Sequence, residues 1–151
     1  MIANPIEDSE YAARTQAVRT ALSARGLDVL LAYGAHRDYH PADLRYLARW
    51  YCVEEETSCV VIALDGPTTL VPDASWDVER AEAEAYADRV RLAPDMGSTL
   101  ADLVREAAGE EARVGIAGFG IFPARSTSPS PASCPGPTSP TPPISPLSCA
   151  W

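Results

Sequence analysis

The chain has 151 residues, which is enough for one domain of ordinary size with a sizeable core. Residues 1–124 hold all 21 acidic residues but only 11 of the 12 basic ones, and every basic residue is an arginine. This acidic balance excludes a nucleic-acid-binding protein and a protein that binds anionic membranes, because both need clustered positive charge.

The N-terminus, MIANPIEDSE, has neither the positive region nor the apolar region of a signal peptide. No run approaches the roughly 18 apolar residues that span a bilayer. We therefore expect a cytoplasmic protein without a membrane partner, in which the four cysteines are thiols rather than disulfides. None of them forms a C-x-x-C pair, so the sequence gives little support for a zinc site.

The chain opens with a pattern of helix, glycine and strand. Tyr11, Val18 and Leu22 recur at helical spacing within residues 7–25, and Gly26 follows where a helix would end. Residues 27–34, LDVLLAYG, form a short apolar run that is typical of a buried strand.

A loop and a hairpin come next. Residues 35–43 are polar and contain a proline, which favours a loop, whereas residues 44–53, LRYLARWYCV, fit no single element. Residues 57–64 and 68–72 are apolar runs on either side of Asp65-Gly66-Pro67, and this arrangement predicts two antiparallel strands.

Two helices and two strands complete the predicted order. Residues 76–89 favour a helix, with Asp77 placed to cap it or to favour the positive end of its dipole. Residues 90–94 predict a brief strand, residues 97–110 a helix with Ser98 or Thr99 as its N-cap and Gly109 as its end, and residues 112–120 the last strand. The whole predicts a single three-layer α/β domain over residues 1–124, in which helices flank a mixed β-sheet.

One cluster contains residues that could bind a metal. His36 and His40, with Asp38 and Asp43, would share a helix face as in a zinc site, but Pro41 interrupts any helix there. A surface loop is the better interpretation. We therefore expect no metal site and no cofactor in this chain.

Two further patterns fail for geometric reasons. The side chains of Glu54, Glu55 and Glu56 are consecutive and cannot converge on one cation. Residues 115–120, GIAGFG, have the spacing G-x-x-G-x-G, not that of a dinucleotide loop, and no helix follows.

The ordered elements resemble the N-terminal domain of the creatinase, prolidase and aminopeptidase P family. The resemblance rests on EYAARTQAVRTALSARGLDVLLAYG, on LRYLARWYC followed by TSCVVIALDGPTTLVPDASW, and on ARVGIAG, and covers residues 8–124. One departure is Arg49, which stands where the family's Y-L-T-G-F segment has a glycine that readily adopts positive φ.

The resemblance implies a division of labour. In this family a C-terminal pita-bread domain holds the catalytic residues and, in the peptidases, two divalent metal ions. The N-terminal domain contributes to dimer contacts and to substrate choice, so the resemblance implies a homo-oligomer. It also implies a substrate-contacting edge at Trp50, Tyr51, Cys52 and Glu54. The alternative is that Trp50 and Cys52 only pack in the core.

Residues 125–151 differ in composition from everything before them. They contain eight prolines, seven serines and three threonines and no acid, a composition that predicts disorder. Because a shifted reading frame of a GC-rich gene yields such residues, we interpret this tail as out-of-frame text. The expected protein is thus a non-catalytic domain, truncated before the catalytic part of a hydrolase that acts on a prolyl peptide or a creatine-like compound. The alternative is a free-standing α/β binding or dimerisation module whose proline-rich tail recruits a partner.

Overall fold

The computed structural model describes residues 6–35, 42–53 and 56–118. In chain order the elements are α1 (Asp8–Arg25), β1 (Val29–Ala35), α2 (Ala42–Ala48), β2 (Thr57–Ala63), β3 (Thr68–Pro72), α3 (Asp77–Glu84), β4 (Arg89–Val90), α4 (Met96–Ala108) and β5 (Val114–Ala117). The predicted tail, residues 125–151, and the predicted boundary at residue 124 lie outside the described residues.

The strands form one five-stranded sheet in the order β4-β3-β2-β1-β5. Strands β1, β2 and β3 are antiparallel neighbours, whereas β5 pairs with β1 and β4 pairs with β3 in parallel. The mixed sheet and the hairpin around residues 65–67 were both predicted from the sequence, and both are confirmed.

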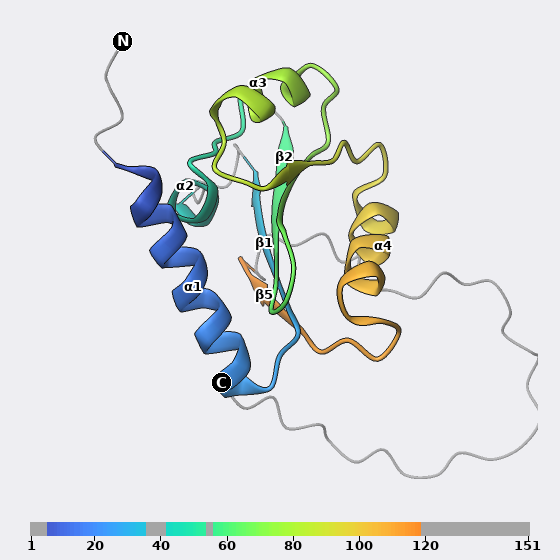
Figure 1. Ribbon diagram of the computed structural model, residues 1–151. Coiled ribbons are helices and arrows are strands. Elements are labelled where there is room, and N and C mark those ends of the chain that lie inside the picture. The colour runs from blue at the N-terminus through green and yellow to red at the C-terminus, as the bar shows by residue number, and fades with distance from the viewer. Residues whose placement is uncertain (1–5, 36–41, 54–55, 119–151) are drawn as a thin grey trace, which may run out of the picture.

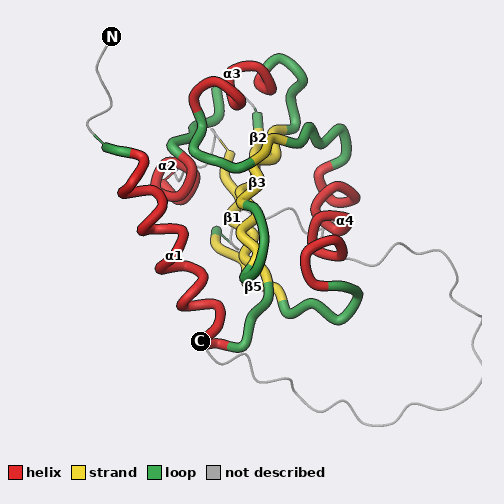
Figure 2. Tube along the Cα trace, in the orientation of Figure 1, coloured by secondary structure: helices red, strands yellow, loops and turns green. Residues whose placement is uncertain are grey.

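Helices cover both faces of the sheet, and each face has its own apolar core. Figure 1 shows α1 and α2 on one side, α4 on the other, and α3 across one end of the sheet. Figure 2 shows the strands as a central layer between the helices. Alternate residues of β1 point to opposite faces: Leu31 and Tyr33 pack with Leu100 and Leu103 of α4. Ala32 packs on the other face with a cluster that comprises Leu44, Leu47, Ala48, Trp50, Cys52, Val60, Ile62, Leu70 and Ala81.

Helix α1 ends as the sequence predicts. Gly26 adopts φ 63°, ψ 33°, and its N–H bonds to the carbonyl groups of Leu22 and Ser23. The left-handed conformation costs glycine little, so the chain turns sharply into β1.

Helix α3 is shorter than predicted, because it stops at Glu84 instead of continuing to residue 89. Beyond it, the Tyr86 N–H bonds to the Ala48 carbonyl oxygen at 2.9 Å, and the Tyr86 ring stacks on Tyr11 with centroids 5.4 Å apart. These tertiary contacts override the helical propensity of the Ala- and Glu-rich sequence.

Asp77 takes the second of its two predicted roles, an acid near the positive end of the α3 dipole, whereas the predicted cap of α4 needs correction. Asp77 makes no capping hydrogen bond; Trp76 is the N-cap residue of α3, and Asp77 follows in its first turn. The N-cap of α4 is Asp95, not Ser98 or Thr99, and its carboxylate accepts a hydrogen bond from the Ser98 N–H at 2.7 Å. Gly109 does end α4, as predicted. Among the described residues, no helix combines the length and the apolar character that crossing a bilayer requires.

Candidate functional site

The residues predicted to contact substrate lie in residues 50–53, which connect α2 toward β2. Trp50 is fully buried, and its indole Nε1 donates a hydrogen bond to Ser58 Oγ at 3.0 Å. The guanidinium carbon of Arg80 lies 3.8 Å from the centroid of the Trp50 ring, which is a close cation–π contact. Trp50 therefore belongs to the core, and the Arg80 guanidinium packs on its ring.

Cys52 is also buried, with 2% of its surface exposed. Its Sγ donates to the Gly34 carbonyl oxygen at 3.6 Å, which ties the segment to β1. Burial raises the pKa of the thiol to about 11, because a thiolate would be poorly solvated there. At neutral pH the group is a neutral thiol and not a nucleophile.

Tyr51 differs from its two neighbours because 42% of its surface is exposed. Arg80 Nη2 donates to the Tyr51 carbonyl oxygen at 3.2 Å, and the guanidinium groups of Arg45 and Arg80 lie 5.5 and 5.0 Å from the ring centroid. The ring thus contacts two cations, and its backbone carbonyl is held by one of them. Glu54, the fourth predicted contact residue, lies outside the described residues.

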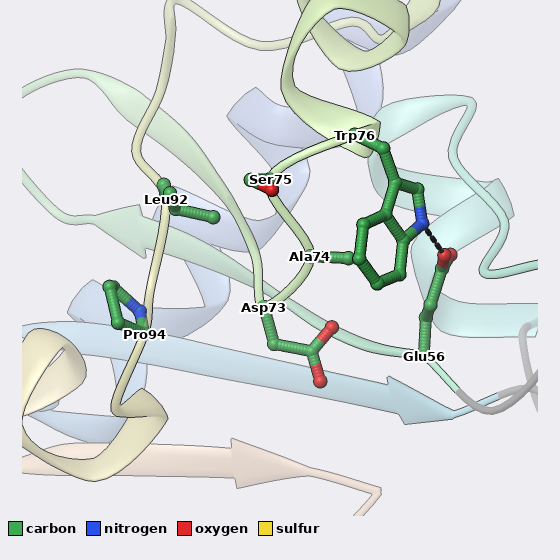
Figure 3. Close-up of a pocket in the computed structure, with 7 residues that line it drawn as sticks. All are labelled: Glu56, Asp73, Ala74, Ser75, Trp76, Leu92 and Pro94. Carbon is green, nitrogen blue, oxygen red and sulfur yellow. Dashed lines mark hydrogen bonds between the residues drawn. The ribbon is translucent and has the colours of Figure 1, made fainter.

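Two residues near this segment gain a role that the sequence did not predict: Trp76 was not singled out, and Glu56 was considered only as part of a charge run. Trp76, at the start of α3, is 73% exposed, and its indole Nε1 donates a hydrogen bond to the Glu56 carboxylate (Figure 3). Glu56 also accepts a hydrogen bond from the Val53 N–H at 3.3 Å. The sequence did contain one signal for Trp76. A tryptophan directly before a helix rich in charged residues has few apolar neighbours in sequence, which favours an exposed position.

Trp76 and Glu56 form one wall of a cavity of about 540 Å³. Its other lining residues are Asp73, Ala74, Ser75, Leu92 and Pro94. Figure 3 shows the indole between Ala74 and the Glu56 carboxylate, with Leu92 and Pro94 on the opposite side. The Asp73 carboxylate is occupied by structural hydrogen bonds, because it accepts from both the N–H and the hydroxyl of Thr57.

Tyr51, Val53 and Trp76 together form what we call the aromatic surface. All three are large apolar residues with more than 40% of their surface exposed. Glu56 joins the Val53 N–H to the Trp76 indole, and Arg80 donates to the Tyr51 carbonyl oxygen. Such a surface can pack against an apolar or aromatic group. Its described side chains supply neither a nucleophile nor a paired general base.

The family of the chain follows from a comparison with known domains. The model of the creatinase/prolidase N-terminal domain matches residues 14–122, which is more than two thirds of the chain. The chain belongs to this family. No curated protein matches the chain in sequence.

Solved structures show the same fold as this creatinase/prolidase N-terminal domain. A proline dipeptidase from Streptococcus pneumoniae superimposes with a TM-score of 0.57 at 18% identity, over 76% of this chain and 79% of that one. A Xaa-Pro aminopeptidase from Streptococcus thermophilus gives 0.54 at 18% identity, over 70% and 73%. The dipeptidase PepE from Mycobacterium ulcerans gives 0.53 at 23% identity, over 72% of this chain but 29% of that longer protein.

Arg49 stands where the Y-L-T-G-F segment has a glycine, and the structure shows how this creatinase/prolidase N-terminal domain accommodates the arginine. Arg49 keeps the positive φ, 56°, that a glycine would adopt readily, directly after α2 ends at Ala48. Its guanidinium forms an ion pair with Asp8 and lies 5.1 Å from the Tyr11 ring centroid. The arginine therefore accepts backbone strain and gains contacts with α1.

The metal ions implied by the family were tested against the residues present. Within residues 6–35, 42–53 and 56–118, no group of three His, Cys, Asp or Glu side chains is arranged to hold a metal ion. These residues do not fit a dinuclear metal centre. His36, Asp38 and His40 lie outside the described residues, and Asp43 stands in the first turn of α2.

Proposed function

We propose that this creatinase/prolidase N-terminal domain is a non-catalytic unit of a creatinase-like or Xaa-Pro aminopeptidase-like hydrolase, and that it acts through the aromatic surface. In this role it contributes to homo-oligomer contacts and to the choice of substrate. The observation that carries the proposal is the exposure of Tyr51, Val53 and Trp76, which Arg80 and Glu56 tie to the fold through hydrogen bonds.

The composition of this surface favours contact over catalysis. Tyrosine, tryptophan and arginine are enriched at the centres of protein interfaces, and the two aromatic residues provide large contact areas at a low cost in side-chain entropy. Arg45 and Arg80 flank Tyr51 and add cationic donors at the edge of the surface. An acidic or planar polar group could bind beside the aromatic rings through these guanidinium groups.

The bonds that such a hydrolase would cleave are C–N bonds, in a prolyl peptide or in a creatine-like compound. On this proposal the acid, base and metal ligands belong to a catalytic domain, and the chain supplies part of the wall around the substrate. The neutral, buried thiol of Cys52 is consistent with a structural role beneath that wall.

Sedimentation velocity on the purified chain tests the assembly role. We expect concentration-dependent dimerisation that the double variant Tyr51→Ser/Trp76→Ser weakens at least tenfold, because both substitutions remove contact area. Tyr46→Ser is the matched control: Tyr46 is a tyrosine that is 53% exposed, against 42% for Tyr51, but it lies on α2 and packs on Arg14. A strictly monomeric chain, or equal loss in the control, would contradict the role in assembly.

A second measurement tests the absence of catalysis. The purified chain, supplied with manganese, cobalt or zinc, should neither cleave Xaa-Pro peptides nor hydrolyse creatine. Turnover that depends on His36 or His40 would overturn the proposal. The alternative with a recruiting tail makes a different prediction, since partner capture would then require residues 125–151 and survive the Tyr51→Ser/Trp76→Ser change.

A further inference from the structure

Two carboxyl groups are buried next to each other beneath the aromatic surface. Glu56 is 8% exposed and Asp77 is 4% exposed, and the two side chains lie within hydrogen-bonding reach. Two ionised carboxylates at such a separation repel each other strongly away from water. A pair of this kind is stable when it retains one proton, which the two groups then share.

The hydrogen bonds around Asp77 show that only one of its two carboxyl oxygens has a donor in the described part of the chain. Asp77 Oδ1 accepts from Arg80 Nε at 3.0 Å and from Arg80 Nη2 at 2.7 Å. The other oxygen, Oδ2, is buried and has no hydrogen-bond donor among the described residues. A buried acceptor without a donor destabilises the fold, and a proton on the neighbouring Glu56 would provide the missing donor.

Glu56 can supply that donor and keep its other contacts. Its Oε1 accepts from the Trp76 indole and its Oε2 from the Val53 N–H. A protonated carboxyl group retains acceptor capacity on both oxygens, so it can donate to Asp77 while it still accepts from Trp76 and Val53. Burial, followed by the hydrogen bond with Asp77, raises the pKa of Glu56 above its ordinary range.

We propose that Glu56 and Asp77 share one proton that links Glu56 to α3 beneath the aromatic surface, and that loss of this proton at higher pH breaks this link. The hydrogen bonds around this link run from Val53 through Glu56 to Trp76 and Asp77, and from Asp77 through Arg80 to Tyr51. Its regulatory meaning rests on the function proposed above, but the shared proton itself does not. We call this arrangement the carboxyl latch.

The groups that face Glu56 act on its pKa in opposite directions. From α3 it faces the Asp77 carboxylate, which favours the proton, together with the indole of Trp76, which opposes it. The Val53 N–H also opposes protonation, and the Arg80 cation is directed to Asp77. Because the Glu56 pKa is raised in the folded chain, the latch is complete at low pH and is lost as the pH rises through that value.

Nuclear magnetic resonance can observe the latch directly. In ¹H–¹⁵N spectra of the full chain, the indole signal of Trp76 (assigned with Trp76→Phe) and the amide signal of Val53 should shift together. We expect a single one-proton transition with a midpoint above 4.5, the ordinary pKa of a glutamic acid. Glu56→Gln, which stays neutral at all pH values, should remove this transition from both signals.

Glu79→Gln is the matched control, because Glu79 is an exposed carboxylate on the same helix. The transition should persist in this variant. If Glu56→Gln does not fold, the ¹³C signal of the Glu56 carboxyl group in the unaltered chain gives the same information. A Glu56 midpoint at or below 4.5, or a Trp76 and Val53 transition that survives Glu56→Gln, would overturn the latch, whereas a monomeric chain would contradict only the proposed function.

Discussion

Arg49 is a residue whose side chain and backbone have opposite effects on stability. Its positive φ is unfavourable for any residue with a Cβ, whereas its guanidinium contacts Asp8 and Tyr11. Both Arg49→Gly and Arg49→Ala lose these side-chain contacts, but only glycine relieves the backbone. We expect the glycine variant to be more stable than the alanine variant by about 1 kcal/mol in urea unfolding. Equal stabilities would show that the left-handed conformation costs nothing here.

Cys52 gives a second prediction for a single residue. With a pKa of about 11, roughly one thiol in a thousand is a thiolate at pH 8, and the side chain is buried as well. Iodoacetamide should therefore label Cys52 at least a hundred times more slowly in the folded chain than in urea, as peptide mass spectrometry would show. Rapid labelling of the native chain would mean that the Trp50–Val53 segment opens readily.

Strand β1 and helix α2 are packed so closely that they constrain one position. A Cβ added at Gly34 would lie 2.6 Å from Leu44 Cδ1 and 2.8 Å from Leu44 Cγ, and Leu44 is fully buried. Gly34→Ala should therefore destabilise the domain by about 1–3 kcal/mol, because the leucine cannot withdraw. Thermal or urea unfolding would measure this loss.

A double variant tests whether the contact with Leu44 is the cause. In Gly34→Ala/Leu44→Ala the new methyl group occupies space that the leucine has left. The double variant should then lose less unfolding free energy than the two single variants lose together. We expect the difference to be about 1 kcal/mol or more. Strict additivity would place the cost of the alanine elsewhere, for example in the backbone of β1.

Regular elements could be predicted from the sequence because their signals are local. Apolar periodicity and turn residues determine the hairpin and α1, and Gly26 marks the end of that helix. The end of α3 could not be predicted, since it depends on Tyr86 meeting Ala48 and Tyr11 from distant parts of the chain. The N-cap of α4 could not be predicted for a related reason. Asp95 is as good a cap as Ser98, and only the folded geometry selects between them.

The candidate site was predictable only in its location. The resemblance predicted that residues 50–54 contain the site. It could not predict which of these side chains are exposed, because side-chain direction in an irregular segment depends on tertiary contacts. Trp50 and Cys52 consequently lie in the core while Tyr51 is exposed. Contact between any of them and a substrate stays a prediction. Trp76 and Asp77 reach this segment from α3, and no local pattern links positions that lie more than twenty residues apart.

The two apolar cores meet at the sheet, and β5 is the edge strand next to β1, whose residues belong to both cores. This strand pairs in parallel with β1, and Val114 packs against the core on the α4 side. Arg113 reinforces the edge, since its N–H and its guanidinium both donate to the Asp28 carboxylate and hold the pKa of that acid below its usual range. These contacts lie within residues 6–118, which predicts that the folded unit does not require the proline-rich tail.

Two truncations test this prediction about the whole molecule. A chain of residues 1–124 should unfold cooperatively with a Tm within about 3 °C of the full chain, because it keeps both cores. A chain of residues 1–112 should lose cooperative unfolding, because β1 then loses its parallel partner and Asp28 its hydrogen-bond donors. Calorimetry or circular dichroism would measure both. A large loss in the 1–124 chain would show that residues 125–151 take part in the fold, and would remove the case for interpreting them as out-of-frame text.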